Sequence, residues 1–220
     1  MDDRAARFAV SGPAAALAIM VVQHGLRSDL SPWSDSISMY GVGAHAYVST
    51  AAVVTLGLAA LALARCLRAG PGSHEVSPAA PLLALWGAGL LLLGVFDADD
   101  GPLDTSGVVH TRIAQFAFGI AVVAVVVLSR AFRRLGWWTA TTALGWAAVS
   151  VAAAVATVVT LESPWFGVTE RVLAVVLVAW SVAVGRIARD GAAPVDANGP
   201  AGSPVPARPE AWDTRSTGYC

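Results

Sequence analysis

The chain has 220 residues, of which 56% are apolar and only 13% are charged. An average soluble domain carries about 25% charged residues, so this composition excludes an ordinary soluble fold. The net charge is −1, and the fourteen cationic side chains are all arginine. With no clustered basic surface, the sequence also excludes nucleic acid as a partner.

Six apolar segments follow one another along the chain. They span approximately residues 8–26, 43–64, 81–96, 110–129, 139–161 and 170–188. About 20 helical residues cross a bilayer, and lipid offers no partner to an unpaired backbone group, so each segment is expected to be a helix. The sequence predicts an all-α integral membrane bundle of six transmembrane helices. The first segment ends without a small-x-small cleavage site, which favours a retained helix over a signal peptide.

The arginines predict the orientation. Most of them flank one set of helix ends: Arg4, Arg7, Arg65, Arg68, Arg130, Arg133, Arg134, Arg186 and Arg189. Arginine gathers on the cytoplasmic side of membrane proteins. We therefore expect both termini to be cytoplasmic, in a multi-pass protein of the plasma membrane. The exclusive use of arginine, with abundant Ala and Val, suggests a GC-rich bacterial genome.

The chain divides at about residue 189. Residues 1–189 form the predicted six-helix transmembrane domain. Residues 190–220 hold five prolines and no apolar periodicity, so they cannot bury enough apolar surface to offset the entropy lost on ordering. They are predicted to be a disordered cytoplasmic tail.

Three histidines fall at the predicted outer boundary, together with an acidic loop. His24 ends the first helix, His45 lies near the start of the second, and His110 opens the fourth, just after the run Asp97–Asp104. Imidazole and carboxylate ligands suit a divalent metal such as zinc. The candidate metal ligands are His24, His45, Asp99 and His110. The alternative is a solvated acidic turn beside histidines that only mark helix boundaries.

Two further groups of polar residues lie at the same boundary. The first loop offers Asp35 and Ser38, although this segment can also serve to cap the second helix, and it lacks a nucleophile-elbow motif. Arg112 and Arg171 depart from the arginine pattern, and Glu170 directly precedes Arg171. The arginines can reach to lipid phosphates or hold an anionic group bidentately.

Three short motifs carry a family resemblance. They are Asp35-Ser36-Ile37-Ser38-Met39-Tyr40-Gly41, then Phe96-Asp97-Ala98-Asp99 followed by His110, then Gly167-Val168-Thr169-Glu170-Arg171. In these motifs the chain resembles a bacterial and archaeal family of six-helix membrane proteins known as domain of unknown function 998, over roughly residues 8–188. Asp97 stands where that family usually has proline. The resemblance places all three motifs on the outer face and implies no activity.

Three functions stay open. The first is a binding or accessory membrane protein whose polar residues form a network between helices. The second is a hydrolase or transferase acting on a lipid-like substrate, with catalytic residues Asp35, Ser38, Asp99 and His110 and substrate-binding residues Glu170, Arg171 and Arg112. The third is a small-solute transporter, which would normally place polar groups near the membrane midplane, whereas the middles of these helices are almost wholly apolar.

Overall fold

A computed structural model describes residues 3–70, 73–96, 98 and 105–190. Within these ranges the ordered elements are helices, and none is a strand. The elements are α1 (Asp3–Leu26), η1 (Ile37–Gly41), α2 (Ala46–Ala69), α3 (Ser73–Val76), η2 (Ser77–Ala79), α4 (Ala80–Leu93), α5 (Thr105–Arg134), α6 (Ala140–Val159) and α7 (Phe166–Asp190). The predicted all-α fold is confirmed. The predicted tail lies almost wholly outside the described residues.

Six helical stretches in the described part of the chain are long and apolar enough to cross a membrane. The prediction of six spans in a multi-pass membrane protein is therefore confirmed. The third span differs most from its predicted range of 81–96, because it begins at His74 and ends at Leu93. The short elements α3 and η2 lead into α4 without a break, and Pro81 stands in the first turn of α4, where proline is tolerated.

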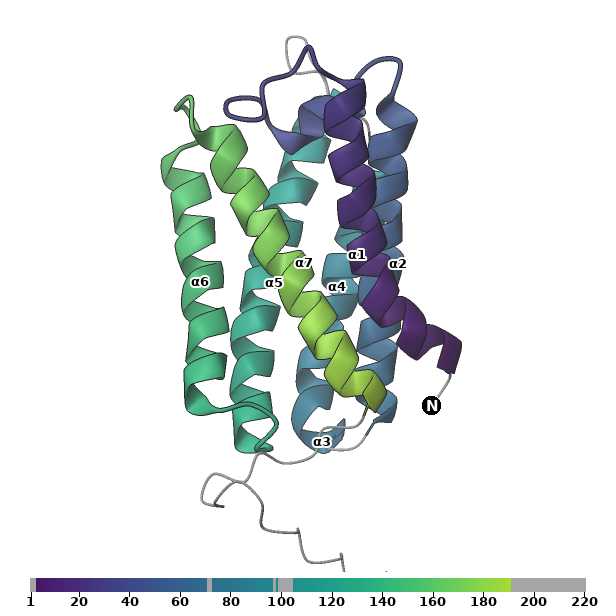
Figure 1. The fold of residues 1–220 in the computed structure, drawn as a ribbon, viewed down its shortest axis with the longest axis vertical. Helices are drawn as coiled ribbons and strands as arrows, with labels where there is room; N and C mark the ends of the chain where they lie inside the picture. Colours follow the sequence, from purple (N-terminus) through teal and green to yellow (C-terminus); the bar gives the residue numbers. More distant parts are fainter. Residues whose placement is uncertain (1–2, 71–72, 97, 99–104, 191–220) are drawn as a thin grey trace, which may run out of the picture.

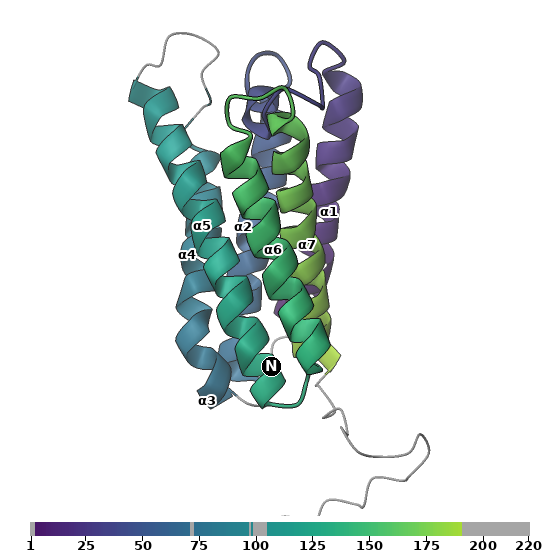
Figure 2. The same ribbon diagram turned by 90° about the vertical axis from the view of Figure 1, so that its left-hand side faces the viewer.

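The helices form a closed ring in which α1 packs on α2, α2 on α4, α4 on α5, α5 on α6 and α6 on α7. The last helix, α7, returns to α1 and also contacts α2 and α5. Figure 1 shows that α7 runs diagonally across the bundle, and Figure 2 shows α6 running beside it. Residues from both ends of the chain therefore meet on α1 and α7.

Small residues allow the helices to approach closely, as is usual where lipid supplies no hydrophobic drive between helices. The closest example joins α2 and α4. A Cβ atom added to Gly57 would lie 2.9 Å from the carbonyl oxygen of Gly87, and one added to Gly87 would lie 2.8 Å from that of Gly57. Both positions therefore exclude any side chain, and α2 and α4 are in backbone contact at this crossing.

The two ends of the bundle differ in their polar residues. The "arginine end" carries the starts of α1 and α4 and the ends of α2, α5 and α7, with the arginines that flank them. The "histidine end" carries the end of α1, the starts of α2, α5 and α7, and the three residues His24, His45 and His110. Between the ends lies an apolar core that includes Trp86, Val125 and Trp180.

Candidate functional site

The connection between α1 and α2, residues 27–45, folds into a cap on the histidine end, and we call it loop one. Its first residue, Arg27, holds the loop together. The Arg27 guanidinium donates to the backbone carbonyl of Val42 and forms a salt bridge of 2.9 Å with Asp29. These N–H groups lower the pKa of the Asp29 carboxyl below its usual value. Contacts within loop one therefore hold its two ends together.

Two adjacent residues of α7 fasten loop one to the bundle. Glu170 accepts a hydrogen bond of 2.6 Å at Oε2 from the backbone N–H of Ile37. Arg171 donates from Nη1 to the carbonyl oxygen of Asp35, at 2.8 Å. The contact is close because Gly167 lies beneath it: a Cβ atom there would stand 2.6 Å from the same carbonyl oxygen. The absence of a side chain at Gly167 therefore allows loop one to contact α7 closely, and Glu170 and Arg171 hold it there by hydrogen bonds.

Arg171 also reaches back to α1. Its Nε–H donates to Nε2 of His24 at 2.9 Å, while Nδ1 of His24 lies 2.6 Å from the carbonyl oxygen of Met20. A carbonyl only accepts hydrogen bonds, so Nδ1 carries the proton and Nε2 presents its lone pair to Arg171. Both ring nitrogens of His24 are thus occupied, and a metal ion at His24 would have to displace Arg171.

Tyr40 completes this cluster. Its ring lies 4.7 Å from the His24 ring, and the guanidinium carbon of Arg171 lies 5.3 Å from the ring centre, a cation–π geometry. Gln23 donates to the Tyr40 carbonyl at 2.7 Å. In the described part of the chain Arg171 forms no salt bridge, and its buried Nη2 has no partner. Backbone oxygens, an imidazole and an aromatic face therefore surround this cation.

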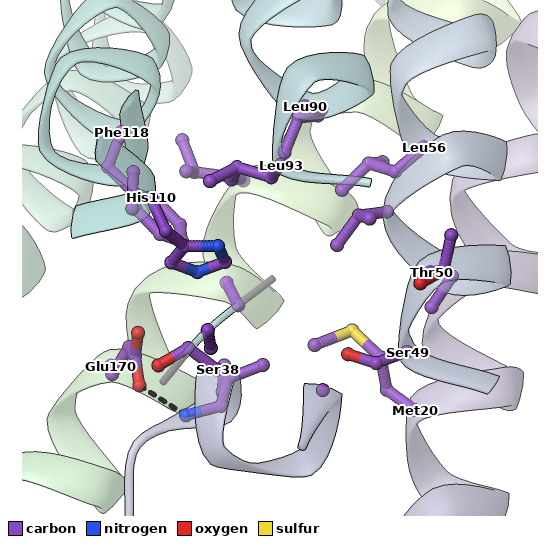
Figure 3. A pocket seen from close by; sticks show the side chains of 18 of the residues that line it. Met20, Ser38, Ser49, Thr50, Leu56, Leu90, Leu93, His110, Phe118 and Glu170 are labelled. Carbon is purple, nitrogen blue, oxygen red and sulfur yellow. Dashed lines mark hydrogen bonds between the residues drawn. The ribbon is translucent and has the colours of Figure 1, made fainter. Parts of the chain in front are cut away.

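A cavity of about 90 Å³ lies beneath loop one, among α1, α2, α4, α5 and α7. Most of its wall is apolar and includes Met20, Leu56, Leu90, Leu93, Phe118 and Leu177. Its polar lining residues are Ser38, Ser49, Thr50, His110 and Glu170. Figure 3 shows His110, Ser38 and Glu170 gathered on one side of this space, with Ser49 and Thr50 across from them. The site is thus an apolar cavity with polar groups along two sides.

His110 is oriented by a backbone contact. Its Nδ1 lies 2.8 Å from the carbonyl oxygen of Phe96, so Nδ1 is the protonated nitrogen and Nε2 keeps its lone pair. The sequence placed His110 at the first turn of its helix, but α5 begins at Thr105. His110 therefore lies in the second turn, where the free N–H groups of a helix start no longer act on it. The helix begins with Thr105, Ser106 and Gly107, which a criterion based on apolar runs leaves out.

The structure brings only some of the predicted site residues together. Ser38, His110 and Glu170 line the cavity, and the Ser38 hydroxyl lies 2.8 Å from that of Ser36. The Asp35 carboxylate instead accepts from the backbone N–H of Ser31 at 2.7 Å, within loop one. Asp99 lies outside the described residues. The proposed catalytic set is therefore represented at the cavity by Ser38 and His110.

The two arginines predicted to bind an anion, Arg112 and Arg171, have different contacts. Arg112 is exposed and donates to Gln115 on its own helix at 3.1 Å, whereas Arg171 is bound to loop one and His24. Their roles in substrate binding stay predictions.

The predicted metal site also stays a prediction. Among the described residues no three His, Cys, Asp or Glu side chains are grouped closely enough to hold a metal ion, and one predicted ligand, Asp99, is outside those residues. His45 directly precedes α2, and its Nδ1 is buried without a partner.

Sequence reasoning missed Ser49, Thr50 and Tyr40. Ser49 and Thr50 lie near the start of an apolar segment. In such a segment a hydroxyl usually bonds to the backbone of its own helix, as Thr50 does to the Ala46 carbonyl, so these two residues were not considered as site residues. Tyr40 is only 2% exposed, which a tyrosine in a predicted loop does not suggest. Ser49 and Thr50 could have been found from their position in the sequence. Both lie one to two helical turns from His45, at the same predicted depth in the membrane as the histidines.

Comparisons with known proteins add one finding. A search among curated proteins and a search among solved structures each found no match. The family described as "Protein of unknown function (DUF998)" matches residues 10–187, which cover the whole helical bundle except its two ends. The chain therefore belongs to the DUF998 family.

Proposed function

We propose that this protein is a binding or accessory membrane protein that holds one end of a lipid-like amphiphile in the cavity beneath loop one. The observation that carries the proposal is the composition of that cavity, an apolar wall with His110, Glu170 and Ser38 converging on one side. An apolar pocket with a few convergent polar groups is the usual form of a small-molecule site. Such a wall favours an alkyl or isoprenoid group, and the polar side fixes its head.

The polar groups indicate the chemistry of that head. Glu170 uses one carboxylate oxygen to accept from Ile37, and a carboxylate can accept several further hydrogen bonds. His110 offers the lone pair of Nε2. Acceptors therefore dominate this side of the cavity, which favours a head group that donates hydrogen bonds, such as an ammonium or a hydroxyl.

The volume limits what enters. About 90 Å³ corresponds to roughly three water molecules, whereas drug-sized ligands occupy pockets of about 300–1,000 Å³. Only a head group or a short chain end fits within the cavity while loop one is seated. The remainder of the ligand would lie between helices, in contact with lipid.

The arginine distribution supports an orientation for this site. Arginine is enriched on the cytoplasmic side, so the arginine end faces the cytoplasm, and loop one and the cavity lie at the extracytoplasmic boundary of a bacterial plasma membrane. The site therefore accepts ligands from the outer leaflet. Its position at one end of the bundle does not favour a small-solute transporter, which binds its substrate near the midplane.

The test compares two alanines of α7. Ala174 lines the cavity, while Ala179 is exposed on the outer surface of the same helix. Ala174→Leu fills the cavity, and Ala179→Leu adds the same atoms on the lipid side. Lipid-like molecules that copurify with the wild-type protein and each variant are extracted and identified by mass spectrometry. We expect one amphiphile to be retained by the wild-type protein and by Ala179→Leu, and to fall about tenfold or more in Ala174→Leu. Equal retention in all three proteins, or no retained amphiphile in the wild type, would disprove the proposal.

A second candidate function, a hydrolase or acyl transferase, is favoured by one observation. Ser38 and His110 line the same cavity, and the contact of Nδ1 with the Phe96 carbonyl leaves the lone pair of His110 on Nε2, where it can act as a base. A general base beside a hydroxyl is the arrangement that activates a serine nucleophile. An alkyl fluorophosphonate should then label Ser38 in the wild-type protein and fail to label it in His110→Ala. If Ser38 stays unlabelled in the wild type, the cavity binds without acyl transfer.

A further inference from the structure

A second site lies at the opposite end of the bundle, independent of the function proposed above. After their backbone contact at Gly57 and Gly87, α2 and α4 enclose a groove of about 680 Å³ toward the arginine end. This volume lies within the range of about 300–1,000 Å³ that is usual for ligand sites. The groove lies between two helices that are long and apolar enough to span a membrane, so lipid is available to it.

The groove has an apolar floor and a cationic mouth. Its floor is made of small residues, Ala64 of α2 with Ala80 and Ala84 of α4, which leave room for an alkyl chain. At its mouth stand Arg65 and Arg68, one helical turn apart on α2 and therefore on the same side of it. The apolar lining continues away from the arginine end through Leu61 of α2 and Leu85 of α4, so an alkyl chain could extend there from a head group held by the arginines.

Among the described residues, no carboxylate is paired with the charge at the mouth. Both arginines are exposed, neither forms a salt bridge within the described ranges, and the residues that line the groove include no carboxylate. The planar guanidinium group binds phosphate oxygens bidentately. Two such groups beside an apolar groove match one phosphodiester head and one acyl chain.

We propose that the groove between α2 and α4 is a binding site for an anionic phospholipid, with its phosphate on Arg65 and Arg68 and an acyl chain over Ala64 and Ala84. A membrane surface charge alone would attract any arginine at this end. The groove distinguishes a specific site from that general attraction. Basic pockets between transmembrane helices bind anionic lipid heads in this way.

The experiment uses the full-length protein in nanodiscs that contain equal parts of phosphatidylglycerol and phosphatidylcholine. Lipids that remain bound after transfer to detergent are counted by native mass spectrometry. We expect the wild-type protein to retain phosphatidylglycerol in clear preference to phosphatidylcholine. Arg65→Gln combined with Arg68→Gln should lose about tenfold or more in retention, because hydrogen bonds between a guanidinium group and a phosphate are charge-assisted and strong.

Two further variants make the test specific. Arg133→Gln combined with Arg134→Gln removes the same charge from the same end of the bundle, on α5 and outside the groove, and should retain phosphatidylglycerol like the wild type. Ala84→Phe fills the groove without changing charge and should lose retention. Equal losses in the two double variants, undiminished retention in Ala84→Phe, or equal retention of both lipids by the wild type would each overturn the proposal.

Discussion

Replacing Gly167 by alanine should unseat loop one from α7. The added Cβ atom would lie 2.6 Å from the carbonyl oxygen of Asp35 and 2.9 Å from both the backbone carbon of Trp33 and Nη1 of Arg171. Ordinary van der Waals contact begins at 3.4 Å. Two of these neighbours are backbone atoms that cannot rotate away, so loop one must retreat by about 0.8 Å.

The retreat weakens the contacts that seat the loop. Arg171 donates to Asp35 at 2.8 Å, and the N–H of Val168 donates to the Trp33 carbonyl at 3.2 Å. Overpacking costs about 1–3 kcal/mol, and a hydrogen bond from a charged donor contributes about 1.5–3 kcal/mol. We expect Gly167→Ala to lower the free energy of unfolding by about 2–4 kcal/mol. The corresponding fall in Tm is about 5–15 °C.

The assay is thermal unfolding in detergent, followed by tryptophan fluorescence. Gly145 provides the matched control, since it lies in α6, is exposed, and has no neighbour within 4 Å of an added Cβ atom. Gly145→Ala should leave Tm unchanged or raise it slightly, because alanine is the better helix former by about 1 kcal/mol. A Gly167→Ala protein as stable as this control would refute the close seat of loop one.

Three other predictions follow from individual contacts. Arg171→Lys should lower the free energy of unfolding by about 1–3 kcal/mol in chemical denaturation, because one ammonium cannot reach both His24 and Asp35. The control Arg112→Lys, at an exposed site, should change it by less than about 0.5 kcal/mol. Equal effects of the two substitutions would count against the cluster around Arg171. Gly87→Val should lower Tm by disrupting the contact between α2 and α4, and Gly119→Val, which meets no atom within 4 Å, should not. The hydrogen bonds from Arg27 lower the pKa of Asp29. The contribution of Asp29 to stability is therefore present above the ordinary carboxyl pKa and is lost as the pH falls through the lowered pKa. The difference in Tm between wild type and Asp29→Asn should be constant from pH 7 to about pH 5 and shrink below about pH 4.

Much of the fold follows from the sequence because the bilayer is a strong constraint. A helix must be long enough to cross it, and its side chains must be apolar. The six spans could therefore be found from run lengths alone. Their ends were less certain, since polar residues continue a helix beyond the apolar run. α5 shows this: it begins at Thr105 and ends at Arg134, several residues outside the predicted 110–129.

The candidate site could be predicted in part. Charge and histidine placement along the chain indicated which helix ends carry polar chemistry, and the structure places His24, His45 and His110 at one end of the bundle. The partners of these residues could not be predicted. The sequence left Arg171 either lipid phosphates or an anionic group, and it did not indicate that Nε and Nη1 meet the His24 ring and the Asp35 carbonyl.

The sequence by itself determined that this is a membrane protein of six helices and at which end of each helix its polar residues lie. This is possible because each segment that crosses a bilayer must by itself be long enough and apolar enough to do so. Only the tertiary structure decided that Arg171 meets His24 across 147 positions, and that Ser38, His110 and Glu170 share one cavity. Those contacts depend on the diagonal course of α7 and on the absence of a side chain at Gly167. Helix crossing angles arise from the packing of small residues between helices, and the hydrophobic pattern of a single helix does not encode them.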